Sequence, residues 1–138
     1  LVLENYINKL NYLDKINEKG YLIKHVYVES AFIAFSGGKT SAVTMSKLQR
    51  FNGMVCYMIR RSLDIQPLLI SPAKARGLVG LKIKRGENTK LKVIEHVTKS
   101  YPNDFLYDLT RMGNPKPGTD DRADAIIIAW AGLNQRKS

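Results

Sequence analysis

Residues 25–41 read HVYVESAFIAFSGGKTS, an apolar run that leads into a glycine-rich turn and a Lys-Thr pair. The run from His25 to Phe35 is rich in β-branched and aromatic residues, which predicts a buried strand. Gly37 and Gly38 turn the chain, and a helix is predicted from Thr40 to about Arg61. Strand, glycine turn, Lys-Thr and helix is also the layout of a nucleotide-binding P-loop.

The P-loop interpretation fails at the position of its first glycine. Counting back from Gly38, Lys39 and Thr40, that glycine should stand where the sequence has Ile33. Isoleucine does not readily adopt the backbone conformation of a phosphate cradle and would crowd the phosphate. We therefore expect no nucleotide cofactor. The turn either brings Lys39 and its N–H groups to a nucleic-acid phosphate or is a plain turn with a solvated lysine.

Helices and short strands alternate on both sides of this stretch. Apolar residues at helical spacing predict an amphipathic helix before it: Val2, Leu3, Tyr6, Ile7, Leu10, Leu13 and Ile16. After the long helix, the sequence predicts a short strand, a short helix capped by Ser71, a helix, a loop and a terminal helix; these cover residues 66–70, the stretch from 71 on, 89–100, 107–118 and 119–133. This alternation predicts one three-layer α/β domain over residues 1–138.

The composition favours a polyanionic partner. The 138 residues include 22 Lys and Arg against 12 Asp and Glu, a net charge of +10. Such an excess suits nucleic acid, although a solvated basic surface is the alternative. Cys56 is the only cysteine, so we expect a buried thiol, no disulfide and a reducing compartment. No run is apolar enough for a membrane span, and the start lacks the pattern of a signal peptide.

Two groups of carboxylates stand out. Glu29 interrupts the apolar strand, where an acidic side chain is costly unless it is paired, bound to a cation or turned to water at the strand end. Asp120, Asp121 and Asp124 open the terminal helix, and pairs three or four residues apart share a helix face. The helix dipole explains acids in the first turn but explains Asp124 less well, because it lies deeper.

These carboxylates indicate a metal site. Hard oxygen ligands on regular elements suit Mg²⁺ or Mn²⁺. The apolar run that follows, residues 125–132, predicts a helix buried on all sides, which would anchor the acidic end against the core. An acid in an early strand, an acidic pair in a late helix and a basic chain together suggest phosphodiester cleavage with two metal ions.

At these residues the chain resembles the RuvC family of Holliday junction resolvases, in the RNase H-like nuclease superfamily. The resemblance rests on the strand VYVES, the helix SAVTMSKLQRFNG, the segment LLISPAKARGLVG, the helix ENTKLKVIEHV and the terminal DDRADA. It implies an RNase H-like domain, in which a mixed central sheet is flanked by helices. Asp-x-x-Asp-Ala before an apolar helix is its most specific part.

The resemblance also implies roles for single residues. Glu29 matches the second of the family's four acidic ligands, and Asp121 and Asp124 match the final pair, with Asp120 as a possible substitute. Lys74 and Lys90 match functional lysines, although either is also compatible with an ordinary surface lysine. Phe32 takes the place of an aromatic residue that stacks at the junction, or it is a core residue.

One part of the family pattern has no counterpart. The family begins with a β-hairpin whose first strand carries an Asp that is the first metal ligand. Asp14 and Gly20 are the nearest candidates for this Asp and the glycine near it, but Asp14 lies in the predicted amphipathic helix and not in an apolar strand. The resemblance therefore implies that the amino-terminal strands are missing from this sequence or are supplied differently.

The expected function is structure-specific cleavage of branched DNA, using Mg²⁺ or Mn²⁺, by a homodimer in the cytoplasm of a bacterium or a phage-infected host. We expect the long helix from Thr40 to form the dimer interface, or else to pack on the sheet. The basic residues expected to contact DNA are Lys39, Lys47, Arg50, Lys74, Arg76, Lys82, Lys84, Arg85 and Lys90. The alternatives are a catalytically inert nucleic-acid-binding module on the same scaffold, and an RNase H-like nuclease for other branched DNA or RNA–DNA hybrids.

Overall fold

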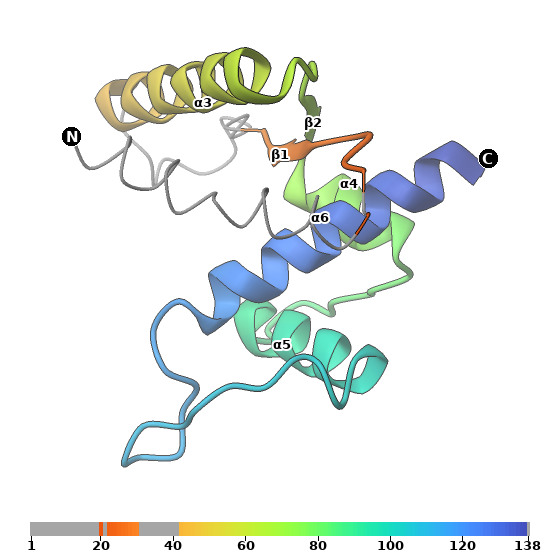
Figure 1. The fold of residues 1–138 in the computed structure, drawn as a ribbon. Helices are drawn as coiled ribbons and strands as arrows, with labels where there is room; N and C mark the ends of the chain where they lie inside the picture. Colours follow the sequence, from red (N-terminus) through yellow and green to blue (C-terminus); the bar gives the residue numbers. More distant parts are fainter. Residues whose placement is uncertain (1–19, 21, 31–41, 138) are drawn as a thin grey trace.

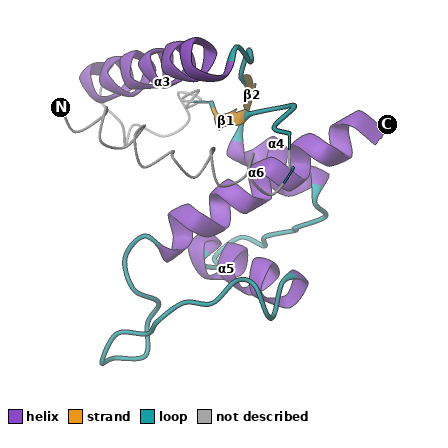
Figure 2. Ribbon diagram, in the orientation of Figure 1, coloured by secondary structure: helices purple, strands orange, loops and turns teal. Residues whose placement is uncertain are grey.

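The structure, a computed structural model, describes residue 20, residues 22–30 and residues 42–137 (Figures 1 and 2). These residues form a mixed α/β fold with a small parallel sheet. Its elements are β1 (Tyr27–Glu29), α3 (Ala42–Leu63), β2 (Leu68–Ile70), α4 (Pro72–Leu78), α5 (Thr89–Ser100) and α6 (Thr119–Lys137).

The sheet pairs β1 with β2 in parallel, with Tyr27 opposite Leu68 and Glu29 opposite Ile70. Parallel neighbours need a long crossover, and α3 supplies it. The Ser30 N–H donates to the Ile70 carbonyl at 2.9 Å, which extends the ladder beyond Glu29. Glu29 therefore lies at the carboxyl end of a short sheet, beside the start of α4.

The strand predicted over residues 25–35 is shorter and less buried than expected. The described part of it is β1 alone, in which Tyr27 and Val28 are half-buried and Glu29 is exposed. Residues 31–35 lie outside the described residues, as do the predicted helix over residues 2–16, the glycine turn, Phe32 and Lys39.

The core lies where α4, α5 and α6 meet below the sheet. In Figure 1, α6 runs through the middle, and it packs against α4, α5 and β1. The largest fully buried side chains are Val93 and Val97 of α5 and Ile127 of α6. Helix α5 has the predicted bounds, because Asn88 caps it by accepting from the Leu91 N–H at 3.2 Å.

The prediction that α6 is buried on all sides is wrong. Ala123, Ile127 and Ala131, spaced by four residues, are buried, whereas Ala125 and Ala129 are exposed. The neighbouring elements of the described chain cover only one side of α6. Alanine is small, so the exposure of Ala125 and Ala129 leaves little apolar area in water, whereas Leu133, one turn further on, is 57% exposed.

Strand β1 is fastened to α6 by Tyr27. Its hydroxyl donates to the Gly132 carbonyl at 3.2 Å and accepts from Arg136 Nε at 2.7 Å. A Cβ added at Gly132 would run into the Tyr27 ring, so this close approach requires glycine. The contact sets the position of β1, and hence of Glu29, against α6.

Helix α3 lies on the other side of the sheet from α6, and within the described chain it has no buried residue (Figure 1). Asn52 Nδ2 donates to the Glu29 carbonyl at 2.6 Å and ties α3 to β1. A cavity of about 400 Å³ separates α3 from Leu69. Cys56 lines this cavity as a free, half-buried thiol, which corrects the expectation of a fully buried one.

Candidate metal centre

The fold brings Glu29 and the acidic end of α6 together. Glu29 closes β1, which packs against α6, and Asp121 and Asp124 lie in the first two turns of that helix. Glu29 and Asp121 are exposed, and Asp124 is half-buried. Strand and helix thus place three carboxylates, distant in sequence, in one electrostatic neighbourhood.

The pKa values show that these carboxylates sense one another. Partial burial and then the negative charge of Asp124 raise the pKa of Glu29, and Asp121 adds to the rise while Arg76 opposes it. Burial also raises the pKa of Asp124; Arg76 opposes this rise, and Asp120 and Asp121 add to it. Ionising these carboxyls together therefore costs free energy, and a cation bound among them would offset this cost.

The carboxylates do not form a closed coordination group. Within the described residues, no three His, Cys, Asp or Glu side chains lie close enough together to hold a metal ion as they stand. Repulsion between like charges keeps carboxylates apart unless positive charge lies between them. In chemistry the donors fit Mg²⁺ or Mn²⁺, because all are hard oxygens and Asp124 is partly withdrawn from water.

Asp120 has a different partner. It forms an ion pair with Lys90 in the first turn of α5, and its side chain is 18% exposed against 74% for that of Lys90. The hydrogen bond from Lys90 lowers the pKa of Asp120, and the same bond raises the pKa of Lys90. The charges of Asp121 and Asp124 also raise the pKa of Lys90. The pair joins the amino-terminal ends of α5 and α6 beside the other carboxylates.

Helix α4 supplies basic residues beside the same group. It starts directly after β2, with Ser71 Oγ accepting from the Lys74 N–H at 3.3 Å as the predicted cap. The Lys74 side chain is exposed, whereas Arg76 is half-buried and its charge lowers the pKa of both Glu29 and Asp124.

Sequence reasoning assigned Arg76 only to a DNA surface and missed this electrostatic link. The order of strand, helix and strand in the sequence could have indicated this link. An element that follows a parallel strand starts at the edge of the sheet where the neighbouring strand also ends. Here that neighbouring strand ends at Glu29.

The other predicted DNA contacts fall into two sets. Lys82, Lys84 and Arg85 are exposed on the connection from α4 to α5, and so continue the basic residues of α4 towards Lys90. Lys47 and Arg50 are exposed on α3, which lies across the sheet from α6. Of the predicted basic contacts, Arg76 and Lys90 interact electrostatically with the carboxylates, whereas the two on α3 lie across the sheet from α6 (Figure 1).

No protein-family model, curated protein or solved structure matches this chain. Across residues 22–30 and 42–137, no helix combines the length and the hydropathy that a bilayer-spanning segment needs.

Proposed function

We propose that this chain is a metal-dependent endonuclease that cuts branched DNA, in the manner of a RuvC-type junction resolvase. The observation that carries the proposal is the electrostatic coupling of Glu29 to Asp124 and Asp121 across β1 and α6. Arg76 of α4 and Lys90 of α5 lie beside this group, and exposed basic residues follow on the connection between these helices, which suits a phosphate backbone.

The proposed roles follow from the chemistry of each side chain. Glu29, Asp121 and Asp124 would hold Mg²⁺ or Mn²⁺, which when bound polarises the scissile phosphate and lowers the pKa of a water. Lys90, held by Asp120, places a positive charge beside the phosphate, and Arg76 adds a second. Hydrolysis that leaves a 5′-phosphate is the outcome that the RuvC resemblance implies.

The architecture supports an RNase H-like domain. Helix α3 on one side of a parallel sheet and α6 on the other give the helix, sheet and helix order of a three-layer fold. In that fold further strands would pair beside β1, and the first acidic ligand would come from one of them. Such a ligand would complete the coordination group that the described residues do not close.

A homodimer is part of the proposal, since a four-way junction offers two strands to cut. Helix α3 suits the interface because five large apolar side chains are exposed along it: Val43, Leu48, Phe51, Met54 and Tyr57. We place the dimer in the cytoplasm of a bacterium or of a phage-infected host.

A second candidate is a catalytically inert nucleic-acid-binding module on the same scaffold. The open coordination group favours it, because the described carboxylates alone do not enclose a cation. The two candidates share the basic residues and the DNA partner, and they differ only in whether a bond is cut.

Cleavage assays on a panel of substrates separate the candidates. The panel is a four-way junction, a Y-fork, an RNA–DNA hybrid and a linear duplex, each with Mg²⁺ and with chelator. We expect the wild type to cut the junction only with metal, and Asp124→Asn to bind it without cutting. Binding without cleavage of any substrate would favour the inert module, and cleavage of the hybrid alone would favour a different RNase H-like nuclease.

A further inference from the structure

The segment between α5 and α6 ends in a narrow hairpin, residues 108–116, that extends away from the helices (Figure 1). Leu109 and Pro115 form an antiparallel bridge, and Lys116 Nζ lies 3.0 Å from Asp108 Oδ2 across it. Three backbone hydrogen bonds close the turn: Thr110 N–H to the Asn114 carbonyl at 2.7 Å, Gly113 N–H to the Thr110 carbonyl at 2.9 Å and Lys116 N–H to the Asp108 carbonyl at 3.0 Å. The hairpin therefore has a defined shape.

This hairpin is fastened to the acidic end of α6. The Arg122 guanidinium donates to the Leu106 carbonyl at 3.1 Å and lies over the Phe105 ring, 5.2 Å from its centroid. Phe105 is in turn buried in the core. Arg122 follows Asp121 directly, so these contacts tie the segment that leads into the hairpin to the acidic end of α6.

The hairpin presents an apolar side chain at its turn. Met112 is 87% exposed, more than any other large apolar residue among those described. Its neighbour Arg111 is the only charged residue of the turn, residues 109–115, and the charge of Lys116 is balanced by Asp108. An exposed apolar side chain beside an unpaired arginine thus forms the tip.

The shape of the tip argues for a nucleic-acid partner over a protein partner. A stable protein interface buries about 800 Å² on each partner, more than one side chain on a narrow hairpin supplies. Proteins that open DNA insert single apolar residues, methionine among them, between base steps, with basic residues on the adjacent phosphates. Unstacking costs least where bases are already unpaired, as at a branch.

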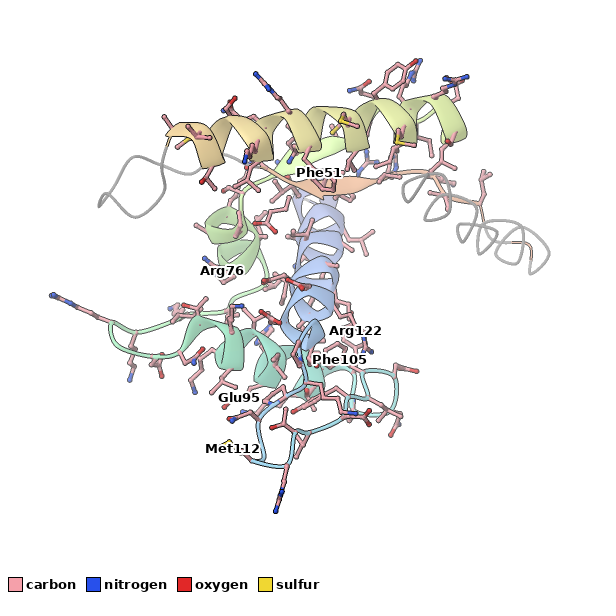
Figure 3. The ribbon with its side chains drawn as sticks, turned by 90° about the vertical axis from the view of Figure 1, so that its left-hand side faces the viewer. Phe51, Arg76, Glu95, Phe105, Met112 and Arg122 are labelled. Atoms are coloured by element: carbon pink, nitrogen blue, oxygen red, sulfur yellow. The ribbon has the colours of Figure 1, made fainter. Side chains whose placement is uncertain are left out.

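The tip lies on the side of α6 where Arg76 of α4 also lies, whereas Arg122 lies on the other side (Figure 3). In Figure 3, Met112 and Arg76 lie on the same side of α6, with Arg76 nearer the sheet and Met112 at the opposite end of the molecule from α3.

We propose that the hairpin over residues 108–116 is a wedge that inserts Met112 between bases at the branch point of a DNA junction. The proposal rests on the proposed function, because it needs branched DNA as the ligand. Arg111 contacts the phosphate beside the inserted methionine, and the Arg122 contacts hold the wedge at a fixed distance from the scissile phosphate.

The test uses 2-aminopurine, whose fluorescence rises when it is unstacked, at the branch of a four-way junction and at the same position in a duplex. Titrations in Ca²⁺ compare the wild type with Met112→Ser, Met112→Leu and the control Leu133→Ser, which alters an exposed leucine of α6. We expect the wild type, Met112→Leu and Leu133→Ser to raise the fluorescence of the junction and not that of the duplex. We expect Met112→Ser to lose the rise and to bind the junction about tenfold more weakly.

Each outcome of these titrations supports or overturns the wedge proposal. Wild type that binds the junction with no rise, or Met112→Ser that gives the full rise, would overturn the wedge and leave the proposed function standing. Wild type that binds no DNA would overturn both. Because Met112 is exposed, all variants should keep the wild-type circular dichroism spectrum, which confirms that a lost rise reports the side chain.

Discussion

Partial burial raises the pKa of both Glu29, at the end of β1, and Asp124, in the second turn of α6, and the negative charge of Asp124 raises the pKa of Glu29 further. The pKa of each carboxyl is above its ordinary value, although the positive charge of Arg76 opposes the rise in both. Carboxyls with perturbed pKa values cluster at functional sites, and we propose that this pair shares a cation.

Removing one of these charges should stabilise the metal-free protein at neutral pH. Glu29→Gln and Asp124→Asn should each raise the free energy of unfolding by about 0.5 kcal/mol, a small gain because solvent screens partly exposed groups. Urea unfolding in the presence of a chelator measures it. A loss of stability in both variants would show that the carboxylates are structural and not in conflict.

The pH dependence should have the matching sign. With folded pKa values above the ordinary 4.5 of Glu29 and 3.8 of Asp124, the folded state binds more protons than the unfolded chain in that range. Stability should therefore fall as pH rises from these ordinary values through the raised ones. The double variant Glu29→Gln/Asp124→Asn should lose this part of the fall in stability. If its stability varied with pH as that of the wild type does, the raised pKa values would be contradicted.

Asp120 and Asp121 should differ in metal binding although they are neighbours. Asp120 is paired with Lys90, whereas Asp121 is exposed on the same helix turn. We expect Mn²⁺ to raise the melting temperature of Asp120→Asn as it does that of the wild type, and the rise to be lost in Asp121→Asn. Asp104→Asn, an exposed acid outside the group, serves as control. A reversed pattern would make Asp120 the ligand.

The contact between Tyr27 and Gly132 should control how β1 sits on α6. Gly132→Ala should destabilise the protein by about 1–3 kcal/mol, since the new methyl group meets the Tyr27 ring. The matched change Gly53→Ala, in α3 with open space around it, should instead stabilise by about 0.5–1 kcal/mol. Equal changes in the free energy of unfolding in the two variants would show that a methyl group at residue 132 fits beside the Tyr27 ring.

The proposed dimer should depend on the exposed face of α3. A charge in the middle of that face, Phe51→Glu, should weaken self-association at least about tenfold in light-scattering measurements, because an unpaired charge in an apolar interface is costly. Leu133→Glu, an equally exposed leucine on α6, should leave it unchanged. A wild type that is monomeric at all concentrations would remove α3 as the interface.

Local signals in the sequence predicted the helices of the second half well. The predicted cap Ser71 starts α4, and α5 covers the predicted residues 89–100, because caps and helical periodicity act within a few residues. The one-sided burial of α6 could not be predicted in this way. The run over residues 125–132 is apolar throughout, and only the placement of α4, α5 and β1 decides which side is covered.

The candidate site was predictable in its residues but not in its pairings. Glu29 and Asp124 stand out in the sequence because each interrupts an apolar element, where a charged side chain is costly to bury. The ion pair of Asp120 with Lys90 and the influence of Arg76 depend on how α4, α5 and α6 meet, which no spacing within one element records.

Calorimetric titration with Mn²⁺ measures whether Glu29, Asp121 and Asp124 bind divalent ions together. We expect the wild type to bind Mn²⁺ and Glu29→Gln and Asp124→Asn each to weaken the binding at least about tenfold, while Asp104→Asn does not. Equal affinity in the wild type and Asp124→Asn, or no binding by the wild type, would contradict this expectation.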